Sequence, residues 1–333
     1  MRWALVHKAK KQLLDFVQHK IEDCKVMIVG DVMLDKYYYG EVKRISPEAP
    51  VPITRVLKEK ETLGGAANVA HNLALLGCKT YLLGSVGDDI HRQSLEKKLT
   101  SLGVNFEGLI CTPGPTTTKL RIIGGHQQMM RLDFEETTPI HPKFEEEILQ
   151  QIIMRISQGV KAIIISDYGK GFCTVNLCNK IIALAKEYAV LVVVDPKGAD
   201  WSKYNGCDYI TPNLKELQET LNTEIINENS VVTASAKIVR KKNKIKNIMV
   251  TRSEKGLSLI GNRLEVHIPT LAQEVFDVSG AGDTVIAVLA LALAGEVEPK
   301  NAAYLANLAA SVVVAKLGTY AISNKELVEV LKK

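Results

Sequence analysis

Short apolar runs rich in β-branched residues alternate with longer stretches of helical periodicity along most of this 333-residue chain. Several of the runs are apolar throughout, such as 163–165 and 191–194. Strands without a polar face are typical of a parallel sheet that helices cover on both sides. The alternation therefore predicts an α/β fold in which a central, mostly parallel sheet lies between two layers of helices.

The pattern assigns strands and helices to definite segments. We expect strands at 25–29, 80–84, 162–166, 190–195, 209–211 and 248–251, and helices at 68–76, 90–102, 176–188 and 214–221. Two further segments, 37–61 and 116–133, alternate like half-exposed strands without helices between them. They predict a small β-sheet lid inserted into a single domain of residues 1–333. Residues 1–22 are expected to form an N-terminal helical extension.

Charge and cysteine content exclude several classes of protein. Lys and Arg number 42 against 37 Asp and Glu, and the net charge of +5 suits anionic small molecules but is too small for a nucleic-acid surface. The longest apolar run, 285–294, is too short to span a bilayer. The six cysteines show neither C-x-x-C nor zinc spacing. We expect a cytoplasmic protein that binds neither nucleic acid nor a membrane.

The stretch 277–284 has the sequence DVSGAGDT and precedes an apolar helical run. Gly280 and Gly282 would let the backbone turn sharply and approach a ligand closely. A helix that begins at about Asp283 would direct its free amides and its dipole toward an anion. Asp283 itself suits a general base that accepts the proton of a substrate hydroxyl. The alternative is an Asp that only caps the helix.

Polar or glycine-containing turns follow most of the expected strands, at 30–31, 166–169, 195–198 and 211–213. Ligands of open α/β sheets bind beyond the carboxyl ends of the strands, so this edge is expected to hold the site. A second glycine pair, Gly64 and Gly65, precedes a predicted helix, where Asn68 would face a polar ligand. An ordinary tight turn with an Asn cap is the alternative there.

The turn 64–68 (GGAAN) and the stretch 277–283 (DVSGAGD) resemble the two signatures of the ribokinase, or PfkB, family of carbohydrate kinases, and the resemblance covers nearly the whole chain. Five more stretches are similar to family members that act on a heptose 7-phosphate: 29–35, 44–52, 127–135, 166–171 and 250–256.

The resemblance implies a ribokinase-like fold and an ATP-dependent kinase. Its substrate would be D-glycero-β-D-manno-heptose 7-phosphate, phosphorylated on the anomeric hydroxyl to the 1,7-bisphosphate in ADP-heptose biosynthesis. The alternatives are another sugar or sugar-phosphate kinase, ribokinase-like or specific for a fructose phosphate, and a non-catalytic sugar-binding module.

The resemblance also implies roles for individual residues. Asp283 would be the catalytic base, and Gly280, Ala281 and Gly282 would offer backbone amides to the developing charge. The sugar phosphate would be bound by Asp31, Asp35, Arg44, Gly64, Gly65, Asn68, Lys119, Arg121, Gln128, Arg131, Asp167, Tyr168 and Lys170. ATP would be bound by Lys197, Asn213, Leu214, Lys215, Glu216, Thr251, Arg252, Ser253, Gly256 and Asn307.

Some of these residues have a second interpretation. Asn213 and Glu216 would hold Mg²⁺ through water, but their spacing also fits a helix-capping box. Asn307 would face the adenine or be a satisfied core amide. The lid, with tyrosines at 37–39 and with Ile53, would pair with the lid of a second copy and form a homodimer.

Overall fold

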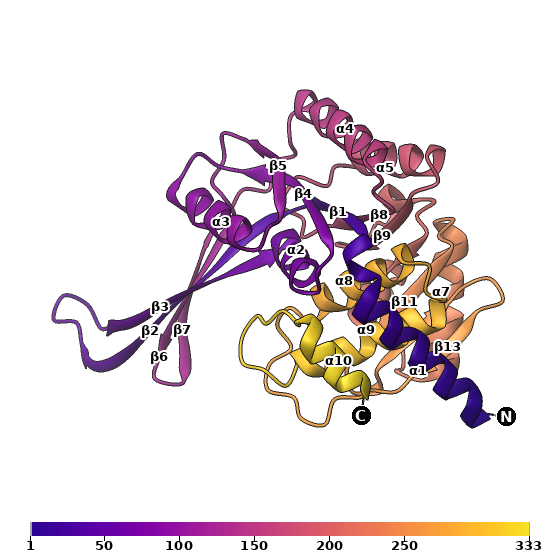
Figure 1. Cartoon of the computed structure of the whole chain (residues 1–333). Helices are drawn as coiled ribbons and strands as arrows, with labels where there is room; N and C mark the ends of the chain where they lie inside the picture. The colour runs from indigo at the N-terminus through magenta and orange to yellow at the C-terminus, as the bar shows by residue number, and fades with distance from the viewer. Residues whose placement is uncertain (1, 333) are drawn as a thin grey trace.

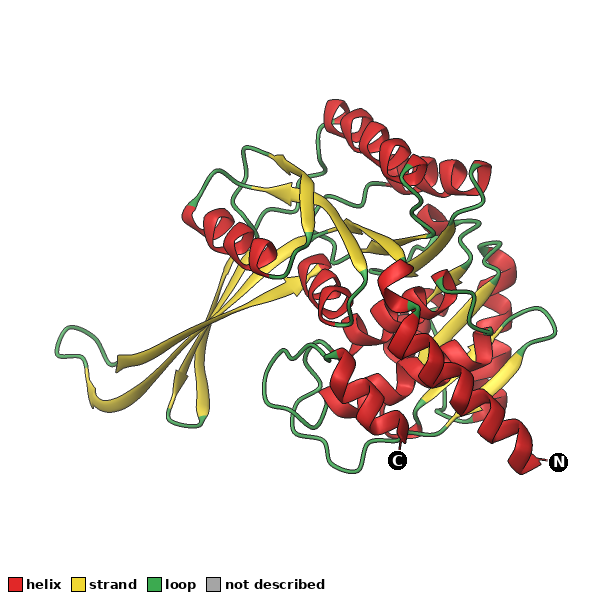
Figure 2. Cartoon of the chain, in the orientation of Figure 1, coloured by secondary structure: helices red, strands yellow, loops and turns green. Residues whose placement is uncertain are grey.

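Nine strands form the central sheet of the computed structural model, which describes residues 2–332 and the side chains of 10–332 (Figures 1 and 2). In spatial order they are β13 (Glu265–Ile268), β12 (Leu257–Ile260), β11 (Asn247–Thr251), β10 (Tyr209–Ile210), β9 (Leu191–Asp195), β8 (Ala162–Ser166), β1 (Lys25–Gly30), β4 (Lys79–Val86) and β5 (Asn105–Cys111). The strands from β11 to β5 run parallel, and β12 and β13 each pair antiparallel with the preceding strand. The predicted, mostly parallel sheet is confirmed.

Helices cover both faces of this sheet and enclose two hydrophobic cores (Figure 2). One core contains side chains of α1 (Arg2–His19), α2 (Ala66–Leu75), α3 (Ile90–Ser101), α8 (Ala281–Ala294), α9 (Pro299–Val313) and α10 (Asn324–Lys332). The other contains side chains of α4 (Pro142–Ser157), α5 (Val175–Glu187), α6 (Leu214–Leu221) and α7 (Asn229–Lys242). Within residues 2–332, no helix is both long and apolar enough to cross a membrane.

The predicted N-terminal helix is present as α1, and its side chains from residue 10 onward pack on the folded core. Leu13, Phe16 and Val17 of α1 are buried in the same core as α8 and α9. The ring of Phe16 lies against Gly295, where an added Cβ would come within 2.1 Å of it. A side chain at 295 would therefore displace α1.

The lid is a four-stranded sheet that projects from the body of the molecule (Figure 1). Its strands, in the spatial order β3-β2-β6-β7, are β3 (Pro52–Gly65), β2 (Val32–Ile45), β6 (Thr118–Gly124) and β7 (Gln127–Phe134). Strands β2 and β3 together extend beyond the predicted 37–61 at both ends. Strand β2 starts two residues after β1 ends, and β3 leads directly into α2. The base of the lid is thus joined to the sheet edge where ligands are expected.

Candidate active site at the carboxyl ends of the strands

Two cavities lie beyond the carboxyl ends of the central strands. The larger, of about 760 Å³, is bounded by the ends of β8 to β11 and by α8 and α9. The smaller, of about 140 Å³, lies at the base of the lid. The turn at the start of α8 separates them, since Gly280 and Asp283 face the smaller cavity whereas Ala281 and Gly282 face the larger. Ala281 and Gly282 thus present backbone to one ligand while Asp283 presents a carboxylate to another.

Asp283 is 5% exposed and receives two hydrogen bonds from distant parts of the chain. The Tyr168 hydroxyl donates to its Oδ1 at 2.6 Å, and the Asn68 side-chain amide donates to its Oδ2 at 2.6 Å. The pKa of the Asp283 carboxyl is raised to about 6, because burial, with a smaller contribution from the nearby Asp35, outweighs the two hydrogen bonds that lower it. A carboxyl that ionises this close to neutrality suits a general base.

The glycine turn has the shape of an anion cradle. Gly280 has a φ of 78°, and a Cβ there would lie 2.9 Å from the Asn68 side-chain nitrogen. At Gly282, by contrast, an added Cβ would meet nothing within 4 Å. Within the described chain its amide has no backbone acceptor, and Gly282 lines the larger cavity, so this amide is open to an anion there.

Two details of this turn differ from the sequence prediction. Helix α8 begins at Ala281, so Asp283 lies in its first turn and is not its first residue. The Ala281 amide donates to the Val278 carbonyl at 3.2 Å and is therefore not free for a ligand. The amides of Gly280 and Gly282 have no backbone acceptor among the described residues, and Gly282 is the one of the two that lines the larger cavity.

The smaller cavity combines acidic and basic side chains. Arg121 donates to Asp35 at 2.5 Å, and Gly64 leaves room for this carboxylate because a Cβ there would lie 2.5 Å from Asp35 Oδ2. Gly65 and Lys119 also line the cavity. Burial, together with the neighbouring positive charge of Lys170, lowers the pKa of Lys119, which forms no ion pair with any described residue. Asp35, Asp133 and Glu135 act on Lys119 from farther away and raise its pKa, but within the described chain none of them forms an ion pair with it.

The larger cavity contains most of the residues predicted to bind ATP: Lys197, Asn213, Glu216, Thr251, Ser253, Gly256 and Asn307. Asn213 and Glu216 do form the capping box of α6, with both reciprocal hydrogen bonds at 2.9 Å. Asn307 donates to the Pro269 carbonyl at 2.8 Å while it faces the cavity. For these residues the structural interpretation and exposure to a ligand hold together.

Asp195, at the end of β9, lines the larger cavity; the sequence placed its turn at the expected site edge but assigned no role to this residue. Burial, then the charges of Asp283 and Glu216, raises its pKa well above the usual range. Burial also raises the pKa of Glu216, and Lys197 is the nearby cation, 3.8 Å from Glu216. Asp195 and Glu216 thus lie in one cavity with little positive charge to neutralise them. Such a pair could hold Mg²⁺, which prefers oxygen ligands and retains water.

Asp31 and Asp167 hold a loop together. The Asp31 carboxylate accepts hydrogen bonds from the amides of Tyr168, Lys170 and Phe172 at 2.7, 3.1 and 3.2 Å. Asp31 lines neither cavity, so its predicted contact with sugar is not supported. Asp167 borders the larger cavity, not the smaller one where sugar binding was expected.

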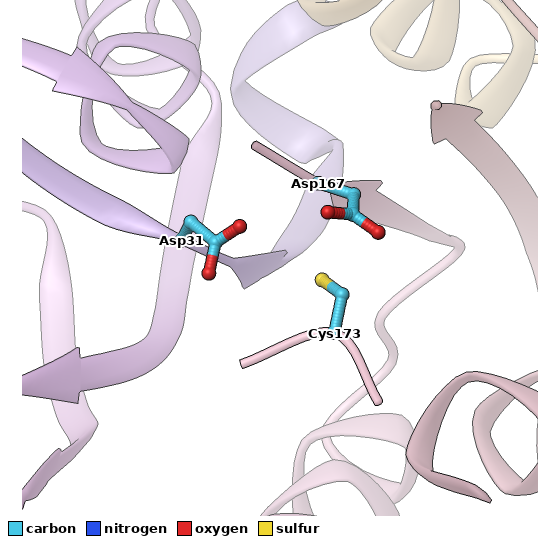
Figure 3. A group of neighbouring side chains, drawn as sticks. All are labelled: Asp31, Asp167 and Cys173. Atoms are coloured by element: carbon cyan, nitrogen blue, oxygen red, sulfur yellow. The ribbon is translucent and has the colours of Figure 1, made fainter. Parts of the chain in front are cut away.

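The same two aspartates face Cys173 across a buried space (Figure 3). The Asp167 carboxylate accepts hydrogen bonds from the Tyr204 hydroxyl at 2.6 Å, from Lys203 and from the Gly169 amide at 2.7 Å. Lys203 already supplies a positive charge there. We therefore assign this group to the support of residues 167–173.

Arg252 is buried and does not reach the larger cavity, unlike its neighbours Thr251 and Ser253. Its guanidinium donates to Asn227 Oδ1, Asn229 Oδ1 and Ser258 Oγ at 2.8, 2.6 and 2.9 Å. The predicted contact of Arg252 with ATP is therefore corrected. The residue anchors the loop that presents its neighbours.

Several other predicted residues lie outside both cavities: Arg44, Gln128, Arg131, Lys170, Leu214 and Lys215. Arg44, Gln128 and Arg131 are exposed on lid strands that lead away from the body. Arg131 is bound to Asp133 at 2.8 and 2.9 Å, and Lys170 to Glu135 at 2.8 Å. Asn68 lines neither cavity but contacts one of them through Asp283.

The raised pKa of Asp283 has a consequence for stability. Because folding disfavours the charged form, the penalty sets in as the pH rises above 3.8 and is complete above about 6. Asp283→Asn removes the charge and is expected to raise Tm by roughly 2 °C or more at about pH 8, and by less at about pH 4.5. Differential scanning calorimetry at both pH values measures this. An unchanged or lower Tm at the higher pH would contradict the unfavourable burial of this charge.

Comparison with known proteins agrees with this geometry. The model of the pfkB family of carbohydrate kinases matches residues 23–326. The bifunctional protein HldE of Shewanella amazonensis is 45% identical over 318 residues, which cover 93% of this chain and 64% of that protein. HldE of Methylobacillus flagellatus is 40% identical over 326 residues, with 97% and 67% covered. The chain thus spans about two thirds of the length of these relatives.

Solved structures show the same fold at lower identity. Arabidopsis thaliana ribokinase, solved with ribose and ATP, has a TM-score of 0.72 at 20% identity over 93% of this chain and 99% of that one. Escherichia coli phosphofructokinase-2, solved with substrates and products, has a TM-score of 0.76 at 18% identity over 93% and 98%. The fold is ribokinase-like, and the chain belongs to the pfkB family of carbohydrate kinases, phosphotransferases that use ATP and an alcohol acceptor.

Proposed function

We propose that the chain is a cytoplasmic, ATP-dependent kinase that phosphorylates the anomeric hydroxyl of D-glycero-β-D-manno-heptose 7-phosphate, a step of ADP-heptose biosynthesis. The observation that carries the proposal is the position of Asp283, a buried carboxylate at the turn between a cavity of nucleotide size and a cavity with an unpaired lysine. The five stretches similar to heptose 7-phosphate kinases and the likeness to the HldE proteins support the choice of sugar.

In the proposed reaction, ionised Asp283 accepts the proton of the anomeric hydroxyl as that oxygen attacks the γ-phosphorus of ATP and ADP leaves. The Gly282 amide and the N-terminus of α8 stabilise negative charge on the transferring group. Asp195 and Glu216 would hold Mg²⁺, with Asn213 beside them, and the ion would neutralise charge on the phosphates. Burial of Asp283 keeps water from competing for its carboxylate.

The charge of Lys119 in the smaller cavity is evidence for a substrate that already carries a phosphate. Arg121 and Lys170 form ion pairs with Asp35 and Glu135, whereas Lys119 faces the smaller cavity and forms no ion pair with a described residue. A half-buried ammonium in this state is stabilised by an anionic ligand. A sugar phosphate whose phosphate is distant from the reacting hydroxyl could place the phosphate against Lys119 and the hydroxyl against Asp283. An unphosphorylated sugar, as a ribokinase-like enzyme would use, leaves Lys119 unpaired.

The reaction is tested by ADP release with Mg-ATP and a panel of sugars: the heptose 7-phosphate, fructose 6-phosphate, fructose 1-phosphate and ribose. We expect turnover with the heptose phosphate, and a loss of about 10²- to 10⁴-fold in Asp283→Asn. Turnover with another sugar only would replace the substrate but keep the mechanism. Sugar binding without turnover would favour a non-catalytic sugar-binding module.

The role of Lys119 is tested by Lys119→Met, with Lys58→Met as the control because Lys58 is an exposed lysine of the same lid. Loss of one charge-assisted contact is expected to raise KM for the heptose 7-phosphate roughly 10- to 100-fold. The KM for unphosphorylated heptose should stay unchanged in both variants. An equal effect on the two sugars would show that Lys119 does not contact the phosphate.

We also propose a homodimer formed through the lid. Apolar side chains are exposed along it, including Ile45, Leu57, Met130 and Phe134. A projecting sheet with open edges and exposed apolar residues is a surface that proteins normally cover. Analytical ultracentrifugation at micromolar concentration should show a dimer, and Leu57→Asp with Met130→Asp should convert it to monomer. A monomeric wild-type protein would contradict the proposal.

A further inference from the structure

Tyr168 lies where the two cavities meet. It lines both of them, and its hydroxyl donates to Asp283 Oδ1 at 2.6 Å. The sequence-based hypothesis treated it as one of many contacts to the sugar. Its hydroxyl hydrogen is instead directed at the carboxylate that accepts the proton in the proposed reaction.

The loop that carries Tyr168 is held from several sides. The Asp31 carboxylate accepts hydrogen bonds from the backbone amides of Tyr168, Lys170 and Phe172. Gly171 has a φ of 88° and passes so close to Thr138 that an added Cβ would lie 2.2 Å from its carbonyl oxygen. This support fixes the backbone on both sides of Tyr168, and with it the place of the phenol.

We propose that Tyr168 is a positioning residue: its hydrogen bond to Oδ1 orients Asp283 and stabilises the carboxylate, so that Oδ2 receives the proton of the substrate. The inference rests on the proposed function. Oδ2 accepts a hydrogen bond from the neutral Asn68 amide and has room to accept the proton of an incoming hydroxyl as well. Oδ1 continues to accept the hydrogen bond of the Tyr168 phenol. Tyr168 transfers no proton itself, since burial and the charge of Asp283 raise its pKa well above 10.

The charges around Asp283 define what loss of the phenol does. Asp35 on β2 repels its ionised form, and the charge of Asp283 in turn raises the pKa of Asp195 on β9. Lys119 and Arg121 on β6 line the same cavity, but Arg121 is paired with Asp35. Two hydrogen bonds stabilise the Asp283 anion, and the one from the Tyr168 hydroxyl lowers the pKa more than the one from the Asn68 amide. Without the Tyr168 hydroxyl, the pKa of Asp283 rises further.

The test is the pH profile of kcat/KM for Tyr168→Phe. The acid limb, expected near pH 6 in the unmodified enzyme, should move up by about one pH unit, so that the variant is impaired most at low pH and recovers as the pH rises. Tyr204→Phe is the matched control, because that hydroxyl donates to Asp167 at the same distance of 2.6 Å and should leave the limb in place. A merely structural role for Tyr168 would lower activity by one factor at every pH, which would overturn the proposal.

A second measurement does not depend on turnover. The carboxyl infrared band that Asp283→Asn removes reports the ionisation of Asp283 in the resting protein. Its midpoint should rise in Tyr168→Phe and fall when 3-fluorotyrosine, a stronger hydrogen-bond donor, is placed at 168. A midpoint that is the same in all three proteins contradicts the inference, whatever the kinase assay shows. A shifted midpoint without kinase activity would contradict only the proposed function.

Discussion

The burial of one negative charge organises this site. Asp283 lies at the N-terminal turn of an apolar helix, between two cavities and close to other carboxylates. A charge in such a place is costly unless donors are fixed around it. Asn68 and Tyr168 are those donors, and Gly280 lets Asn68 approach. The result is a carboxylate that ionises near neutrality, which a surface aspartate would not do, and this gain in reactivity comes at a cost in stability.

Three distant residues meet at the carboxyl edge of the central sheet. Tyr168 follows β8 of the parallel sheet, Asn68 lies in α2 directly after the lid strand β3, and Asp283 lies in the first turn of α8. Strand β1 pairs with β8, and the lid strand β2 begins two residues after β1 ends, so the base of the lid and the loop after β8 lie at the same edge. The lid starts at the end of β1, which brings Lys119 to the smaller cavity, while most of the lid projects from the body of the molecule.

The sequence predicted the parts of the site that depend on local pattern. The glycine turn before Asp283 and the capping box of Asn213 and Glu216 are short motifs whose geometry is set within a few residues, and both were found. Arg252 was misplaced because the direction of a side chain at the end of a strand depends on what packs beneath it, here two asparagines and a serine. Arg44 was misplaced because a sequence does not show how far a lid strand leads from the body.

Contacts between distant segments left no signal of their own. Tyr168 and Asp283 are 115 residues apart, and a tyrosine in a polar turn does not reveal its partner. Asp195 ends an apolar strand like several other polar residues, and only its proximity to Glu216 distinguishes it.

The central claim, that Asp283 receives a proton between two bound substrates, is tested most directly by a crystal structure with the heptose 7-phosphate and a non-hydrolysable Mg-ATP analogue. We predict the anomeric hydroxyl at about 2.6–3.2 Å from an oxygen of Asp283 and in line with a γ-phosphate against Gly282. A sugar bound with another hydroxyl at this position, or away from Asp283, would contradict the account.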